Sequence, residues 1–255
     1  MIFRLAILLG LTGAQFVFAQ DRATAEPPSP PTPDQAAPPV KPTVEKIDAT
    51  HFKIGKVTFD QKSREIRFPA KINIVTGQLE FLVVHVNGKV HESLFVTDVS
   101  ATHLNLAFTL LRYPPSPELY ALPSEAGGLS GDFPVVPAEI KSGARIAIEV
   151  EWKDNEKTRR ISINDWIQHA TTTKAMPLGP WIYGASVIED GKYVPEFTGD
   201  IIAIFLANSA MINYPGDDNG NDDVWIPFPK RVPAVDTEVT VILSPFNSNK
   251  TASKP

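Results

Sequence analysis

The chain has 255 residues, of which 43% are hydrophobic and 21% charged, with a formal net charge of -5 and no cysteine. These proportions are typical of a globular protein with a sizeable core. The negative charge and the lack of a basic cluster exclude an electrostatic footprint for nucleic acid. Without cysteine the chain has no disulfide, no thiol nucleophile and no lipid attachment at a cysteine.

The first nineteen residues have the pattern of a secretory signal. Arg4 supplies the positive region, residues 5–11 the apolar region, and Val17 to Ala19 a small-residue cleavage site. The apolar run is short for a bilayer span, and an uncleaved anchor is the alternative. The predicted location is periplasmic or extracellular, with membrane contact only through an uncleaved signal segment.

Residues 20–45 are rich in proline and cannot bury apolar surface, which predicts a disordered linker or tether. Recognition of this segment by a partner is the alternative. A folded domain is expected over residues 46–246, followed by a polar tail over 247–255. Two strand patterns open the domain, at 52–59 and 66–72. Pro69 lacks an amide donor and places the second of these strands at a sheet edge or a bulge.

The densest set of chemically capable residues surrounds Asn87-Gly88, a dipeptide that favours a two-residue hairpin between apolar runs. In that register His85 and Glu92 share an otherwise apolar face, and His91 points to the other face. A carboxylate on a core face requires a hydrogen-bond partner or a function. We therefore expect Glu92 either to be satisfied by His85 or a backbone amide, or to bind or react.

Known catalytic patterns do not fit this stretch. His91-Glu92-Ser93-Leu94-Phe95 begins like a zinc-protease helix but has Phe95 where the second histidine belongs. Ser93 is not flanked by the glycines of a hydrolase elbow. An enzyme using Glu92 with His85, or His91 with Ser93 and a distant acid, is the alternative to binding. The acids considered are Asp98, Asp165 and Asp200.

Downstream, the spacing of Leu104, Ala107, Phe108 and Leu111 predicts an amphipathic helix that Asp98 or Ser100 caps. Residues 114–143 are predicted to form a cover over the sheet, or else to be disordered. Residues 146–152 alternate as a strand, and residues 154–157 turn it back into a hairpin. Next, the pattern predicts a short helix with Trp166 and strands near 181–185, 201–206 and 237–243. Gly184 and Gly199 are predicted to mark bulges or close backbone approach.

One loop, residues 217–223, is dense in oxygen ligands of the kind that calcium takes. Its spacing departs from the EF-hand, because Pro215 stands five positions before Gly220 where an acid is required. A solvated turn is the favoured interpretation. We predict no cofactor, with calcium as the alternative; its candidate ligands are Asp217, Asp218, Asp222 and Asp223.

Several short runs resemble the YdjY-domain family of secreted bacterial proteins, in the same order from about Gly55 to about Pro245. They are residues 82–97, Trp152-Lys153-Asp154, Asp165-Trp166-Ile167, Lys174-Ala175-Met176, Trp181 with Gly184, Gly199-Asp200 and Asn208-Ser209-Ala210-Met211. The family has no established activity, so the resemblance implies an exported protein but no reaction. The run Asp217-Asp218-Asn219-Gly220 is more acidic than the family pattern.

The predicted fold class is α+β: predominantly antiparallel β with one main amphipathic helix and one short helix, in one or two lobes. The predicted function is a non-catalytic module that binds a small ligand or an envelope protein. The alternatives are a hydrolase or metal-assisted enzyme and a structural envelope protein. The catalytic candidates are His85, His91, Glu92 and Ser93, and the binding candidates are Glu92, His91, Trp166, Trp181 and Asp200.

Overall fold

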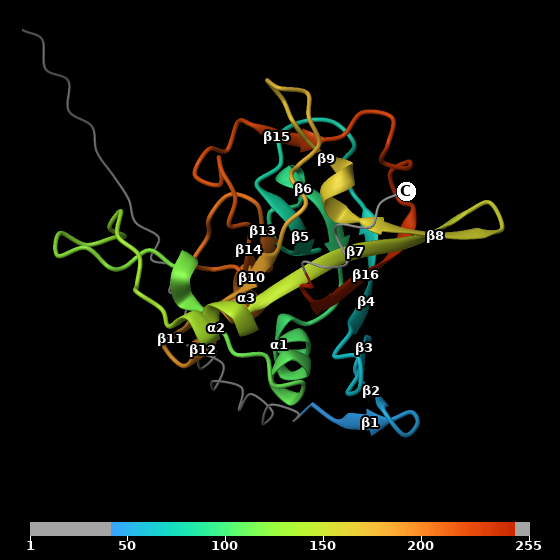
Figure 1. Ribbon diagram of the computed structural model, residues 1–255, viewed down its shortest axis with the longest axis horizontal. Helices are drawn as coiled ribbons and strands as arrows, with labels where there is room; N and C mark the ends of the chain where they lie inside the picture. Colours follow the sequence, from blue (N-terminus) through green and yellow to red (C-terminus); the bar gives the residue numbers. More distant parts are fainter. Residues whose placement is uncertain (1–41, 248–255) are drawn as a thin grey trace, which may run out of the picture. The chain divides into compact units, whose positions relative to one another are not determined.

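Strand pairing dominates the computed structural model, which describes residues 42–247 (Figure 1). Its strands are β1 (Val44–Lys46), β2 (His51–Ile54), β3 (Val57–Asp60), β4 (Ile66–Ile72), β5 (Phe81–His85), β6 (Ser93–Thr97), β7 (Arg145–Asp154), β8 (Lys157–Ser162), β9 (Ile167–His169), β10 (Trp181–Tyr183), β11 (Ile188–Glu189), β12 (Lys192–Tyr193), β13 (Asp200–Ala203), β14 (Ile212–Asn213), β15 (Trp225–Pro227) and β16 (Glu238–Pro245).

Eight of these strands close into a barrel. They pair in the order β4, β16, β7, β10, β14, β13, β5 and β6, and β6 pairs again with β4. The α+β prediction is wrong, because the apolar strand faces are buried against one another across the barrel and not under a layer of helices. The predicted preponderance of antiparallel pairs is confirmed, with parallel pairing between β5 and β6 and between β13 and β14.

Two barrel strands are each shared by two diverging sheets. On one side, β4 pairs with β16 along nearly its whole length. On its other side, β4 pairs with β3 at Ile66 and Arg67 and with β6 at Lys71 and Ile72. In the same way β16 holds one edge of β7, and β8 and β10 divide the other. We call these two places the β3/β6 fork and the β8/β10 fork.

Pro69 shows why the chain tolerates a proline within a barrel strand. It lies on β4 between the residues that pair with β3 and those that pair with β6. Its carbonyl accepts a hydrogen bond from Thr97 Oγ1 of 2.7 Å, so its backbone points into the β3/β6 fork. The missing amide hydrogen leaves no ladder bond unmet there. The prediction that this strand lies at a sheet edge or a bulge is wrong, because β4 pairs with β16 on one side and with β3 and β6 on the other.

The core fills the barrel because its strands alternate between buried and exposed residues. Along β4 the buried positions are Ile66, Phe68, Ala70 and Ile72, and β7 buries Ile146, Ile148 and Val150. The predicted strand at 146–152 is confirmed, as is the hairpin that joins it to β8. Asn155 has φ 54° in that turn, a conformation that two-residue hairpins require.

Within residues 42–247 the helices are α1 (Ala101–Leu110), α2 (Ala138–Gly143) and α3 (Val194–Thr198). The buried side chains of α1 belong to the same core as those of the barrel. Short 3₁₀ turns cover Val90–Glu92, Pro117–Leu119 and Ile163–Trp166. α1 is the predicted amphipathic helix, and of the two proposed caps Ser100 accepts the hydrogen bond from the His103 amide. Its Phe108 ring stacks on Tyr183 of β10 at 4.0 Å between centroids. No helix within residues 42–247 is long and apolar enough to cross a bilayer.

The predicted hairpin at Asn87-Gly88 is wrong. β5 and β6 are parallel neighbours, with Phe81 opposite Ser93 and His85 opposite Thr97. Neither turn residue has a positive φ, so the two-residue turn does not form. Gly88 is needed for a close approach instead: a Cβ there would lie 3.0 Å from the Thr198 carbonyl oxygen.

The described residues form one unit, so the alternative of two separate lobes is wrong. β1 begins at Val44, two residues inside the stretch predicted as a linker. The segment 114–143 is held by buried Tyr113 and Tyr120, whereas Leu122 and Phe133 are exposed. The predicted signal peptide and nearly all of the proline-rich linker lie outside the described residues.

Candidate functional site

Glu92 occupies the position that the sequence marked as unusual, but its neighbours differ from those predicted. Its side chain is 22% exposed, and its Oε1 lies 3.1 Å from His91 Nε2. Its carboxyl group is also close enough to that of Glu80 to share a hydrogen bond when one of them is protonated, and this contact raises the pKa of Glu80. The expectation that Glu92 needs a partner is confirmed, and the expected partner, His85, is wrong.

Parallel pairing separates His85 from Glu92. His85 lies opposite Thr97, whereas Glu92 precedes the residue opposite Phe81. Five strand positions between the two sites correspond to about 16 Å. His85 Nδ1 accepts a hydrogen bond from the Asn87 amide instead. The two residues therefore cannot form one acid–base pair.

Glu80 is the member of this site that sequence reasoning missed. Burial raises its pKa first, and the hydrogen bond and negative charge of Glu92 raise it further; Asp222 adds to this and Lys89 opposes it. The hairpin register had placed Glu80 and Glu92 on opposite faces, which hid the pairing. The available signal was an acidic residue at the start of each of two apolar runs.

Ser93 and His91 do not supply a catalytic pair. Ser93 is fully buried, and its hydroxyl donates a 2.8 Å hydrogen bond to the Phe95 carbonyl. The side chain of His91 is 78% exposed, and its Nε2 faces Glu92. Because its only donor proton is committed within the core, Ser93 is not positioned as a nucleophile.

The remaining binding candidates serve the core. Trp166 and Trp181 are 2% and 0% exposed, so their rings offer no stacking surface to a ligand. Asp200 is 2% exposed, and its Oδ2 accepts a short hydrogen bond from Ser209 Oγ. This contact joins the start of β13 to the segment before β14. Its other oxygen, Oδ1, is buried and has no hydrogen-bond partner among residues 42–247.

The acidic loop does not gather its carboxylates at one point. Asp218 Oδ2 lies 3.2 Å from His169 Nε2, and Asp223 Oδ1 accepts a hydrogen bond from Gln78. The negative charge of Asp222 helps to raise the pKa of Glu80. Within residues 42–247 no three His, Asp or Glu side chains are grouped so that they could hold a metal ion. The four candidate calcium ligands, Asp217 among them, are not brought together.

Hollows occur on the outer face of the barrel, at the two forks. The first hollow, of about 650 Å³, lies at the β3/β6 fork and extends over β4, β16 and β7 to Thr158 of β8. The second, of about 570 Å³, lies at the β8/β10 fork, between Ser162 of β8 and Leu178 before β10. Diverging sheets leave a wedge beside the strand they share, which explains why both hollows occur where they do.

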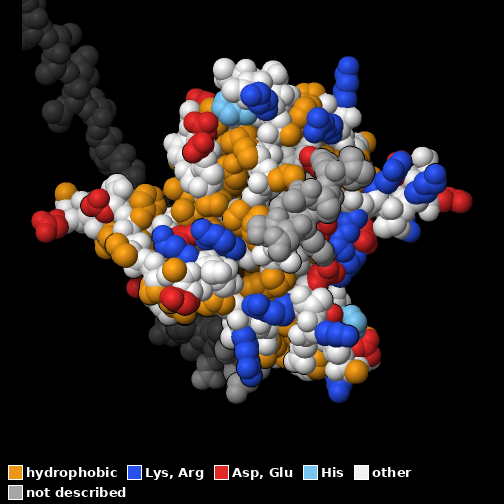
Figure 2. Space-filling model, in the orientation of Figure 1, with side chains coloured by type: hydrophobic (Ala, Val, Ile, Leu, Met, Phe, Trp, Pro, Cys, Tyr) orange, Lys and Arg blue, Asp and Glu red, His pale blue; other side chains and the backbone are white. Residues whose placement is uncertain are grey.

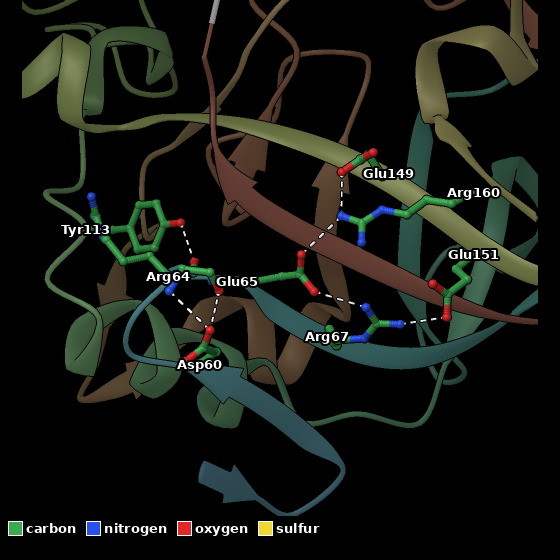
Figure 3. Close-up of polar contacts among 9 residues, drawn as sticks. Asp60, Arg64, Glu65, Arg67, Tyr113, Glu149, Glu151 and Arg160 are labelled. Atoms are coloured by element: carbon green, nitrogen blue, oxygen red, sulfur yellow. Dashed lines mark hydrogen bonds and ion pairs between the residues drawn. The ribbon is translucent and has the colours of Figure 1, made fainter. Parts of the chain in front are cut away.

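An alternating chain of ion pairs crosses the face between the hollows (Figure 3). Arg67 donates to Glu151 at 2.7 Å and to Glu65 at 3.0 Å. Arg160 donates to Glu65 at 3.1 Å and to Glu149 at 2.6 Å. The side chains come from β4, β7, β8 and the residue before β4, so the network ties both forks together.

This network also explains why Ile242 of β16 is buried although it lies on the outer face of the barrel. Ile242 is 0% exposed although it lies opposite Arg67 and Glu149, which point outward. The aliphatic stems of long charged side chains cover apolar surface while their heads stay in water. Burial by itself would raise the pKa of Glu65, but hydrogen bonds from Arg67 and Arg160 outweigh it and the pKa is lowered. Glu65, which lies between the two arginines, therefore stays charged at neutral pH.

Both hollows present fixed charges of both signs. Lys56, Lys71 and Lys153 line the first together with Asp98, Glu151 and Glu238, and Arg160 with Glu65 and Glu149 line the second. Paired charges on rigid strands hold their positions, so a ligand meets a prearranged pattern of donors and acceptors. Such a pattern suits recognition of a polar chain. Neither hollow is lined by His85, His91, Glu92 or Ser93, although two of the candidate distant acids are present, Asp98 in the first hollow and Asp165 in the second.

Comparison with known proteins agrees with the runs noted in the sequence. The YdjY domain profile matches residues 57–244, which include β3 to β16 up to Ser244. No curated protein and no solved structure matches the chain. The match covers well over half of the 255 residues. The chain belongs to the YdjY domain family.

Proposed function

We propose that this chain is an exported, non-catalytic binding module that holds a polypeptide segment of a partner protein across the outer face of β4, β16 and β7. The observation that carries the proposal is the pair of hollows at the two forks, with the ion-pair chain between them. Export follows from the signal pattern of residues 1–19.

The spacing of the hollows fits an extended segment. Along β7 the first hollow takes Glu151 to Lys153 and the second takes Ala147 to Glu149. A chain that spans both would need about five to seven residues at roughly 3.3 Å each. Both signs of charge line the route, which suits a segment with mixed polar side chains. A small rigid ligand would fill only one hollow.

The catalytic alternative receives no comparable support. Ser93 is buried, His85 is remote from Glu92, and Glu92 is paired with Glu80 outside both hollows. General acid–base chemistry requires the acid, the base and the reacting group within hydrogen-bond reach. His91 and Glu92 are within that reach, at 3.1 Å, but neither residue lines either hollow.

A photo-crosslinking amino acid tests the proposal in the full chain, expressed in cells. Placed at Thr240, on the outer side of β16 in the first hollow, it is expected to form an adduct with a polypeptide. The matched position is Thr109, which is exposed on α1 away from both hollows. The same adducts at both positions, or none at Thr240, would refute the binding role. Mass spectrometry of the secreted chain tests export, since cleavage after Ala19 predicts a new N-terminus at Gln20.

A further inference from the structure

β8 is a strand with one unpaired edge. It pairs with β7 from Lys157 opposite Asp154 to Ser162 opposite Glu149. The residues flanking a two-residue turn bond to each other, so in an alternating ladder Lys157, Arg159 and Ile161 face β7. The backbone groups of Thr158, Arg160 and Ser162 therefore point outward. Within residues 42–247 no strand pairs with this edge, so the backbone groups of Thr158 and Arg160 have no ladder partner there. Ser162 is the N-cap of the 3₁₀ turn Ile163–Trp166, so its carbonyl belongs to that turn and only its amide is available.

This edge is open to a partner. The first four residues of β8 are exposed, and the hairpin of β7 and β8 projects from the barrel wall (Figure 1). β8 leaves the barrel at the β8/β10 fork, where β10 takes over the pairing with β7. An added strand would therefore meet no other strand of the barrel along β8.

The charges on β8 select the partner. The strand carries Lys157, Arg159 and Arg160 and no acid, and Lys and Arg side chains gather over the projecting hairpin (Figure 2). Antiparallel pairing with β8 of a second copy would oppose like charges, which destabilises a strand pair. Arg159 is already paired with Asp154, and Arg160 with Glu65 and Glu149, whereas Lys157 has no ion pair within residues 42–247. A carboxylate on an incoming strand would supply the missing partner of Lys157.

We propose that the free edge of β8 accepts an extended, carboxylate-bearing segment of a partner protein as an added β-strand. The proposal rests on the binding function inferred above and names the partner's conformation and charge. Ser162 and Arg160 also line the second hollow. A strand on this edge would thus direct alternate side chains toward that hollow, while its backbone bonds to Thr158, Arg160 and Ser162.

The test uses the full chain and two synthetic heptapeptides, one alternating glutamate with threonine and one alternating lysine with threonine. NMR titration is expected to show binding of the glutamate peptide and slower amide exchange at Thr158, Arg160 and Ser162. Thr158→Pro removes an outward amide that the fold does not use, and is expected to weaken binding about five- to tenfold. Thr158→Val keeps the amide and loses the same hydroxyl, and is expected to bind like the unaltered chain.

Some results would overturn strand addition while leaving the binding module intact. One is a partner that crosslinks at Thr240 and binds equally well to the Thr158→Pro variant. Another is equal affinity of the chain for the lysine peptide and the glutamate peptide. A third is NMR shifts on adding the glutamate peptide that are confined to residues of the two hollows. Self-association through β8 in sedimentation would also overturn it. Should Thr158→Pro fail to fold, amide exchange in the unaltered chain decides, since unchanged exchange at the three outward amides in the bound state refutes the proposal.

Discussion

Glu80 and Glu92 meet carboxyl to carboxyl where β5 and β6 begin. Their backbones are also joined, since the Glu80 amide donates to the Glu92 carbonyl at 3.1 Å. A hydrogen bond between two carboxyl groups requires that one of them carries a proton. Burial and the charge of Glu92 raise the pKa of Glu80 above its ordinary value of 4.5, so this proton is held more tightly in the folded chain.

The first prediction is a pH-dependent contribution of Glu80 to stability. Because its pKa is raised on folding, its contribution is fully present below pH 4.5 and is lost as pH rises through the raised value. Glu80→Gln keeps a neutral side chain at every pH. At pH 7.5 it is expected to raise the free energy of unfolding by about 0.5 kcal/mol, the scale of a like-charge cross-strand pair.

Urea denaturation at pH 4 and pH 7.5 measures this difference, with Glu156→Gln in the exposed β7–β8 turn as the matched control. The gain from Glu80→Gln is expected to shrink at pH 4, below the raised pKa of Glu80, where Glu80 of the unaltered chain holds its proton. A gain of the same size at both pH values would contradict the shared proton.

Glu65 is predicted to behave with the opposite sign. Hydrogen bonds from Arg67 and Arg160 outweigh its burial and lower its pKa, so its contribution is present above its ordinary pKa and is lost as pH falls through the lowered value. Glu65→Gln is expected to cost about 0.5–1 kcal/mol at pH 7.5, discounted because the network is partly exposed. The cost should shrink in 1 M salt and below pH 4; a cost independent of both would exclude the ion pairs as its cause.

The contact between Asp200 and Ser209 is predicted to be energetically coupled. Ser209→Ala leaves a carboxylate that is 2% exposed without its donor, at a cost of about 1–3 kcal/mol. Thermal or urea unfolding of Ser209→Ala, Asp200→Asn and the double variant forms a mutant cycle. The double variant should lose less than the sum of the two single losses. Additive losses would mean that the hydrogen bond does not join the two segments.

Gly184 is predicted to tolerate no side chain, because a Cβ there would lie 2.3 Å from Tyr120 Oη. The Tyr120 hydroxyl cannot yield, since it donates to the Ala210 carbonyl and accepts from the Ser186 amide, both at 2.8 Å. Gly184→Ala is expected to cost roughly 2 kcal/mol or more in urea unfolding. Tyr120→Ala removes the hydroxyl, Cζ and Cε2 atoms that the Cβ would meet at 2.3, 2.4 and 2.7 Å. Combined with Gly184→Ala it should cost less than the sum of the two single changes; full additivity would refute the clash.

The position of Pro69 shows how far local rules carry a prediction. A proline has no amide hydrogen and must occupy a place with no ladder bond, and Pro69 does so in the gap between β3 and β6. The predicted sheet edge is wrong, because β4 is paired on both sides. Ser100 as a helix cap, the alternation of Ile146, Ile148 and Val150, and the close backbone approach at Gly199 are confirmed. At Gly184 the close neighbour is the Tyr120 side chain and not backbone. Each confirmed prediction depends on residues a few positions apart, or on the chemistry of one side chain.

Asn87 and Gly88 show where such rules fail. Their turn propensity is worth little beside the burial of β5 between β6 and β13, and the barrel imposes a parallel pairing instead. That choice decides which acid meets Glu92, separates His85 from it, and places the forks and their hollows. The sequence alone determined the family resemblance, the strand-forming segments and the need for a partner at Glu92. The tertiary structure decided the barrel and the site, because strand order and register follow from contacts between residues far apart in the chain.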